Sequence, residues 1–148
     1  MTTSSPSSAT SGYAGEILPE DAWKRLAAEP NAKIIDVRTQ AEWSFVGVPD
    51  LSSVGKQVLL VSWQVFPTMV RNDAFLAQVE AHGVKKDDVV LLLCRSGVRS
   101  RAAAELLTAQ GYQAAWNITD GFEGPHDGDK HRGDVAGWKA AKLPWAQG

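Results

Sequence analysis

"DVVLLLCRSGVRSRAAAELL", residues 88–107, contains the features that decide the fold of this chain. Residues 88–94 form an apolar run without the alternation of a half-exposed strand, which predicts a strand covered on both faces. Residues 99–110 are predicted to form a helix, and Gly111 is the residue expected to end it. A buried strand, a short loop and a helix in this order are typical of a parallel α/β sheet.

The rest of the chain continues this alternation of helices and strands. Further helices are predicted for residues 18–28 and 72–83, and one helical turn for residues 41–45. Asn72 or Asp73 is the expected cap of the helix at 72–83, and Gly83 its expected end. Further strands are predicted for the runs at 33–37, 56–63 and 113–118. The pattern predicts a parallel sheet with helices on both faces.

Composition narrows the class of protein. The chain has 148 residues, 44% hydrophobic and 22% charged, which suits one soluble globular domain. A net charge of -2 and a pI near 5.9 argue against a nucleic-acid partner. No stretch approaches the roughly 18 apolar residues of a membrane span, and the N-terminus lacks the features of a signal peptide. A single cysteine favours a reducing cytoplasm and argues against structural zinc.

The chain is expected to consist of one domain with two flanking segments. Residues 1–12, rich in Ser and Thr, are predicted to form a disordered tail, because they cannot bury enough apolar area to offset the entropy of ordering. Residues 13–124 are predicted to form the domain. Residues 125–148 are rich in Gly, charge and Trp, and we expect them to pack on or near it.

Cys94 ends the predicted strand 88–94, and open α/β sheets bind ligands at the carboxyl ends of their strands. Backbone N–H groups of the tight loop that follows can converge on an anion, and the start of the next helix adds partial positive charge. Gly97 supplies the backbone freedom of a tight ring, and Arg99 is predicted to bind an anion. These surroundings favour the thiolate, the nucleophilic form of cysteine.

Two simpler interpretations stay open at this point. Free cysteines are among the most buried residues and often pack as small, inert hydrophobic groups. The arginines after Cys94 can line a solvated helix face, an interpretation that suits Arg101 better than Arg99. No histidine lies near Cys94 in the sequence, so its activation would depend on loop amides and arginine rather than on a base.

Several short motifs resemble those of rhodanese-like domains. They are DVR at 36–38, AEW at 41–43, CRSGVRS at 94–100, GY at 111–112 and ITDGFEG at 118–124. The third is similar to the active-site loop of the family and is the most specific. The resemblance covers roughly residues 13–124 and implies a five-stranded parallel sheet flanked by helices on both faces. One segment departs from the pattern, because SFVGVPDL at 44–51 replaces a motif that contains histidine in many members.

The resemblance implies a single-domain thiosulfate sulfurtransferase without cofactor or metal. An anionic donor such as thiosulfate would pass its outer sulfur to Cys94, leaving a persulfide and releasing sulfite, and cyanide or a thiol would accept the sulfur. Asp36 and Arg38 are implied to brace or tune the loop. A sulfur-relay protein is a further candidate partner. The implied substrate-binding residues are Arg95, Ser96, Gly97, Val98, Arg99 and Ser100.

Other interpretations compete with this one. A phosphatase or arsenate reductase loop needs Cys-x5-Arg, whereas Cys94 and Arg99 are spaced as Cys-x4-Arg, a shorter ring that suits a sulfur atom better than a tetrahedral oxyanion. A non-catalytic interaction module, or a carrier that moves sulfur between proteins, is another alternative. His126 and DGDKHRGD at 127–134 are more typical of a solvated loop than of a metal site. A further hypothesis is that His131 or Arg132 covers the Cys94 pocket.

Overall fold

The computed structural model describes residues 13–39, 42–43, 48–65, 70–94, 98–119, 138, 143 and 145–146. Its helices are α2 (Pro19–Ala28), α4 (Phe75–Ala81), α5 (Val98–Ala109) and the short 3-10 helix η1 (Ser52–Val54). Its strands are β1 (Gly15–Ile17), β2 (Ala32–Asp36), β3 (Val48–Pro49), β4 (Leu59–Leu60), β5 (Gln64–Val65), β6 (Val70–Arg71), β7 (Val89–Leu93), β8 (Ala114–Ile118) and β9 (Trp145–Ala146).

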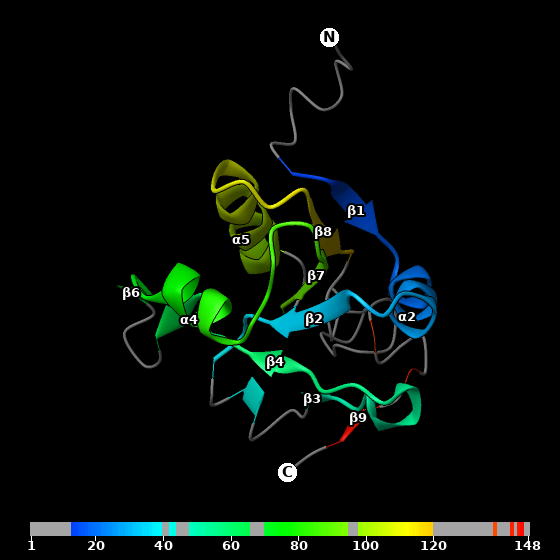
Figure 1. Ribbon diagram of the computed structural model, residues 1–148. Coiled ribbons are helices and arrows are strands. Elements are labelled where there is room, and N and C mark those ends of the chain that lie inside the picture. The colour runs from blue at the N-terminus through cyan, green and yellow to red at the C-terminus, as the bar shows by residue number, and fades with distance from the viewer. Residues whose placement is uncertain are drawn as a thin grey trace, which may run out of the picture.

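The central layer is a five-stranded sheet in the order β1-β8-β7-β2-β4, and every neighbouring pair in it is parallel (Figure 1). β7 lies in the middle, where Leu93 is in register with Asp36 of β2 and Leu92 with Asn117 of β8. The chain returns to the sheet through helices, as parallel pairing requires. The predicted five-stranded parallel sheet with helices on both faces is therefore confirmed.

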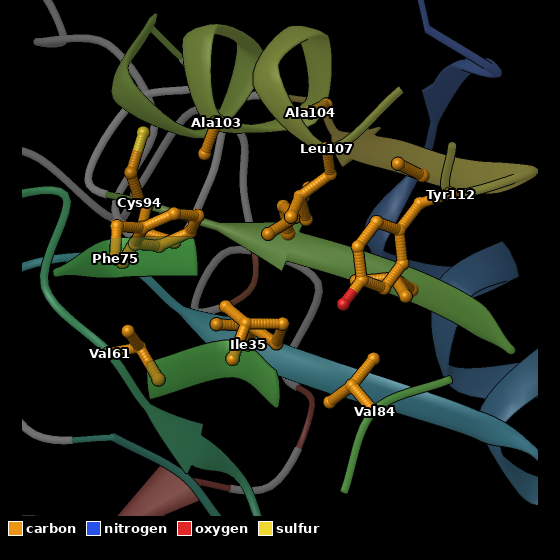
Figure 2. Close-up of a cluster of buried hydrophobic side chains, with 14 residues drawn as sticks. Ile35, Val61, Phe75, Val84, Cys94, Ala103, Ala104, Leu107 and Tyr112 are labelled. Atoms are coloured by element: carbon orange, nitrogen blue, oxygen red, sulfur yellow. The ribbon is translucent and has the colours of Figure 1, made fainter. Parts of the chain in front are cut away.

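Helices cover both faces of this sheet, and β7 contributes to both layers of the core. Val90, Leu92 and Cys94 lie in one cluster with residues of α4 and α5, which Figure 2 displays. Val89, Leu91 and Leu93 point to the other face and lie in a second cluster with residues of α2. Alternate side chains of a strand point to opposite faces, so a strand buried on both must be apolar throughout.

Helix α5 ends just before Gly111, the residue that the sequence predicts to end it. Gly111 has φ 98, a left-handed conformation that glycine adopts without the steric cost of a Cβ. The N–H of Tyr112 then donates to the carbonyl of Leu107 at 3.0 Å, and the N–H of Gly111 to that of Thr108 at 3.1 Å. These bonds use carbonyls that the helix leaves without partners at its end.

Several sequence-based assignments differ from the structure. β1 was not predicted from pattern, because three residues carry no period. Within residues 56–63 only Leu59–Leu60 pairs as a strand of the main sheet. The helix expected at 72–83 begins at Phe75 with Ala74 as its cap and no side-chain cap bond, so the predicted Asn72 or Asp73 cap is wrong. Asn72 instead accepts a hydrogen bond from the N–H of Ala74 in the preceding turn.

Parts of the C-terminal stretch contact the core. Trp138 is 0% exposed and meets Trp23 edge to face, with ring centroids 5.9 Å apart. β9 pairs with β3 in antiparallel fashion. Residues 1–12 and most of 125–148 lie outside the described residues, so the predicted domain boundaries stay predictions. Within the described part of the chain, no helix has the length and hydrophobicity to cross a membrane.

Candidate active site

Cys94 is the first residue after β7 and faces the first turns of α5 (Figure 2). It is 1% exposed and lies in the same apolar cluster as Ala103 and Ala104, which are both 0% exposed. These small side chains let α5 lie close to the sheet, and α5 begins at Val98, four positions after the cysteine. The predicted loop residues Arg95, Ser96 and Gly97 lie outside the described residues.

Ser100 is the residue of α5 whose hydroxyl meets the sulfur. Its Oγ lies 3.2 Å from Sγ of Cys94, and the side chain is fully buried. The same oxygen contacts Oδ1 of Asn117 on β8. A hydroxyl at this place can donate to a thiolate or accept from a thiol, so it serves either protonation state of Cys94.

Arg99 lies beside this site and binds a carboxylate within the chain. Its Nη1 and Nη2 donate to Oε1 and Oε2 of Glu42 at 2.7 and 2.8 Å, a bidentate pair in which each side chain is 18% exposed. Burial alone would raise the pKa of Glu42, but the hydrogen bonds and charge of Arg99 outweigh this and hold that pKa below its usual range. Burial would likewise lower the pKa of Arg99, while Glu42, and to a lesser extent Cys94 and Asp36, raise it.

A capping box holds Glu42 in position. The N–H and Oγ1 of Thr39 donate to Oε1 of Glu42 at 3.2 and 3.1 Å, and the N–H of Glu42 lies 3.4 Å from Oγ1 of Thr39. This reciprocal arrangement of a threonine and a glutamate three residues later is a helix-start motif. Thr39 and Glu42 carry this motif in the sequence, and it is the signal that could have identified Glu42, a site residue absent from the sequence-based prediction.

Asp36 and Arg38 form a fully buried ion pair at the end of the neighbouring strand β2. Nε of Arg38 donates to Oδ1 of Asp36 at 2.9 Å and Nη2 donates to Oδ2 at 2.6 Å, and both side chains are 0% exposed. The N–H of Val37 between them donates to the carbonyl of Leu93, the residue before Cys94, at 2.8 Å. This backbone hydrogen bond connects the segment that holds the ion pair to the end of β7, next to Cys94. The bracing role implied for Asp36 and Arg38 requires such a position.

The structure therefore brings Cys94, Arg99, Ser100, Asp36 and Arg38 to one end of the sheet, where β2 and β7 end and α5 begins. Val98 is placed there as the first residue of α5. Such a site can present a nucleophilic sulfur beside a helix start and an arginine. Among the described residues, no group of three or more His, Cys, Asp or Glu side chains is placed to hold a metal. His126, His131 and Arg132 lie outside those residues.

Comparison with protein families identifies one matching model, the STR4 middle domain, over residues 15–148. An uncharacterized protein of Rickettsia conorii is 39% identical over 129 residues, which cover 87% of this chain and 94% of that protein. The rhodanese-like domain-containing protein 4 of Arabidopsis thaliana, a chloroplastic protein, is 26% identical over 86% of this chain but only 25% of its own length.

Two solved structures support the same fold. The crystal structure of Rv0390 from M. tuberculosis matches with a TM-score of 0.83 and 47% identity, over 92% of this chain and 99% of that one. The solution structure of a polysulfide-sulfur transferase homodimer from Wolinella succinogenes matches with a TM-score of 0.66 and 22% identity, over 95% of this chain and 83% of that one. The second likeness supports the fold alone.

Proposed function

The chain belongs to the STR4 middle domain family and has a rhodanese-like fold, and from this premise we propose that it is a sulfurtransferase. It moves a sulfane sulfur from an anionic donor such as thiosulfate to cyanide or a thiol through a persulfide on Cys94. The observation that carries the proposal is the position of the only cysteine: at the end of the central strand, at the start of α5, with the Ser100 hydroxyl 3.2 Å from its sulfur.

The chemistry of the proposed reaction needs a nucleophilic sulfur and a good leaving group. The Cys94 thiolate attacks the outer sulfur of thiosulfate, a new S–S bond forms, and sulfite leaves with the electron pair of the old S–S bond. Cyanide or a thiolate acceptor then attacks the outer sulfur of the persulfide, and Cys94 leaves as the thiolate. The N-terminal end of α5 favours negative charge on the sulfur at both stages.

Arg99 is the proposed ligand of the donor's anionic end, since a guanidinium fits an oxyanion with two parallel hydrogen bonds. In the structure Glu42 holds both of these positions. A sulfonate donor therefore shares or displaces Glu42 when it binds, so Glu42 competes with the donor for the cation. The matching Wolinella succinogenes protein is a polysulfide-sulfur transferase, so polysulfide is a second donor class to test.

Asp36 and Arg38 act in this proposal as a brace for the reacting strand end. Their opposite charges are paired with each other at 2.6 Å, so the two largely offset one another beside Arg99. Arg95, Ser96, Gly97 and Val98 are proposed to supply backbone amides to the thiolate and the persulfide.

Intact mass spectrometry after incubation with thiosulfate tests the proposal. We expect a mass gain of one sulfur atom, release of sulfite, and loss of the added mass when cyanide is supplied. Cys94→Ser is expected to show no gain while keeping its circular dichroism spectrum, because it removes the nucleophile and changes one atom. A gain in Cys94→Ser, or no gain in the native chain with thiosulfate or with polysulfide, would refute the persulfide assignment.

The acceptor step is tested separately. A persulfide that forms but passes its sulfur slowly to cyanide and small thiols supports the carrier form of the proposal, in which another protein accepts the sulfur. Rapid formation of thiocyanate supports the enzyme that acts on small acceptors. Appreciable hydrolysis of an aryl phosphate by the pure protein would favour the phosphatase alternative instead.

A further inference from the structure

A connected series of polar side chains leads from Cys94 to the edge of the sheet. Oγ of Ser100 lies 3.2 Å from Sγ of Cys94 and also contacts Oδ1 of Asn117. Nδ2 of Asn117 lies 3.0 Å from each carboxylate oxygen of Glu16. Cys94, Ser100 and Asn117 are 1%, 0% and 3% exposed, whereas Glu16 is exposed. We call this series the Glu16 relay.

Strand register brings the distant members of the relay together. Glu16 of β1 is directly in register with Asn117 of β8, although 101 residues separate them. Asn117 lies on the same face of β8 as Ala115, which belongs to the cluster formed with α5. Both relay members on the sheet therefore face the helix that carries Ser100.

Glu16 determines which way the amide of Asn117 points. An ionised carboxylate only accepts hydrogen bonds, so the end of the amide that faces Glu16 must be its NH2 group. Oδ1 then faces Ser100. Glu16 also accepts from Oγ1 of Thr119 at 3.1 Å and from the hydroxyl of Tyr13, and these donors keep the carboxylate in place.

Ser100 has one hydroxyl hydrogen and two acceptors within reach. When the hydrogen points to Oδ1 of Asn117, Ser100 presents lone pairs to the sulfur, an arrangement that suits a thiol S–H. When the hydrogen points to the sulfur, it stabilises the thiolate, and Oδ1 of Asn117 no longer accepts a hydrogen bond from Ser100. The amide and the thiolate therefore compete for the same hydrogen.

We propose that Glu16 and Asn117 are positioning residues that draw the Ser100 hydrogen away from Cys94 and so keep part of the cysteine in its thiol form. Glu16 strengthens the competition because its charge-assisted bonds fix the amide with Oδ1 toward Ser100. The reactivity of the buried sulfur thus depends on a carboxylate at the edge of the sheet. This inference relies on the proposed function only in treating Cys94 as the reacting group.

A titration of the thiolate by its ultraviolet absorbance tests the relay. Cys94 is the only cysteine, so Cys94→Ser supplies the background. We expect Glu16→Gln to raise the thiolate-to-thiol ratio on the acid side of the titration about three- to tenfold, as loss of one competing hydrogen bond would. The glutamine side chain can donate as well as accept, so the amide of Asn117 is no longer held in one orientation. Glu105→Gln, an exposed acid on α5, is the matched charge control and is expected to leave the ratio unchanged.

Two further variants separate the relay from a simple effect of charge. Asn117→Ala removes the competing acceptor while Glu16 keeps its charge, so the relay predicts a rise in thiolate here too. In a Ser100→Ala background the relay has no hydrogen to compete for, and Glu16→Gln should then change nothing. An unchanged titration in Glu16→Gln would overturn the proposal. So would a rise that persists with Ser100→Ala, because charge alone would explain it.

The measurement uses no sulfur donor and is therefore independent of sulfur transfer. A relay effect with no persulfide formation would leave the positioning role standing and remove the proposed function. Persulfide formation with an unchanged titration would support the proposed function and overturn the positioning role. Circular dichroism and thermal melting of each variant identify any loss of fold, and the exposed position of Glu16 makes Glu16→Gln the variant least subject to it.

Discussion

Arg38 and Asp36 form an ion pair in which both side chains are 0% exposed. Removing one member leaves the other charge buried without its partner, which costs more than the pair itself contributes. We expect Arg38→Ala to lower the free energy of unfolding by about 3–5 kcal/mol, measured by urea denaturation. Glu29→Ala, which removes the surface pair with Arg25, is the matched control and should change little. A loss as small as that of the control would mean that the brace has no structural role.

Glu42 competes with the donor for Arg99 in the proposed mechanism. Glu42→Gln keeps the size of the side chain but removes its charge. The side chain at position 42 then binds the Arg99 guanidinium less strongly and competes less with an anionic donor. We expect the KM for thiosulfate to fall about three- to tenfold with a smaller change in kcat, consistent with one charged hydrogen bond. Steady-state kinetics with Glu29→Gln as the control checks this. A rise in KM would show instead that Glu42 holds Arg99 in the geometry that binds the donor.

The same pair predicts how stability depends on pH. Arg99 lowers the pKa of Glu42 in the folded chain, so the folded state favours the ionised carboxylate. The resulting stabilisation is present above the unfolded carboxyl pKa of about 4.3 and is lost as pH falls through the lower folded value. Urea midpoints of the native chain and of Glu42→Gln should therefore differ at neutral pH and converge in acid. A difference that stays constant with pH would contradict this linkage.

The sequence predicts the candidate site residues that lie close together along the chain. Cys94, Arg99 and Ser100 follow from one loop and the helix after it, and the structure places all three together. Glu42 was detectable through its capping box with Thr39 but lies 57 residues from the arginine it binds. Glu16 and Asn117 meet only through strand register, which a single sequence does not encode in any local pattern.

A helix end that is followed by glycine can be predicted well from the sequence. Gly111 was expected to end α5, and it does so with φ 98. β1 was missed for the opposite reason, since three residues with no period resemble a loop. The strand predicted at 56–63 is longer than β4, which comprises Leu59–Leu60. The N–H groups of Val61 and Trp63 still donate to the carbonyls of Asp36 and Val37 at 3.1 and 2.9 Å, so backbone bonding to the neighbouring segment continues past β4.

Gly111→Ala tests the energetic part of this interpretation. A Cβ at Gly111 would meet Lys86 no closer than 3.6 Å, so its cost comes from the left-handed backbone rather than from a clash. We expect a loss of about 1 kcal/mol in the free energy of unfolding. Gly111→Asn should lose less, because asparagine tolerates this conformation better. Equal losses for the two variants would point to another cause, and urea denaturation distinguishes the outcomes.

At the scale of the whole molecule, alternation of helices and strands predicted the parallel sheet, but strand order lay beyond the sequence pattern. The order β1-β8-β7-β2-β4 puts the cysteine-bearing strand in the centre, where both faces are covered. That position explains the continuous apolar run before Cys94 and the small residues of α5 over it. The same segment therefore supplies both the proposed reactive cysteine and buried apolar side chains of the core.

The C-terminal stretch contributes the Trp138 side chain to the core. Trp138 is 0% exposed and belongs to the cluster on the α2 face of the sheet, and the family model also extends to residue 148. If this side chain completes the core, Trp138→Ala leaves a large cavity. We expect it to lower the free energy of unfolding by about 3–5 kcal/mol.

Urea denaturation of Trp138→Ala, beside Leu18→Ala with its 53% exposed side chain, measures that contribution. A double-mutant cycle with Trp23→Ala isolates the ring contact, expected at about 0.5–1.5 kcal/mol beyond the area buried. Should Trp138→Ala unfold at the same urea concentration as the native chain, residues 13–124 would suffice as the folding unit. A large loss would instead extend that unit through Trp138, because the face of the sheet opposite α5 would be incomplete without it.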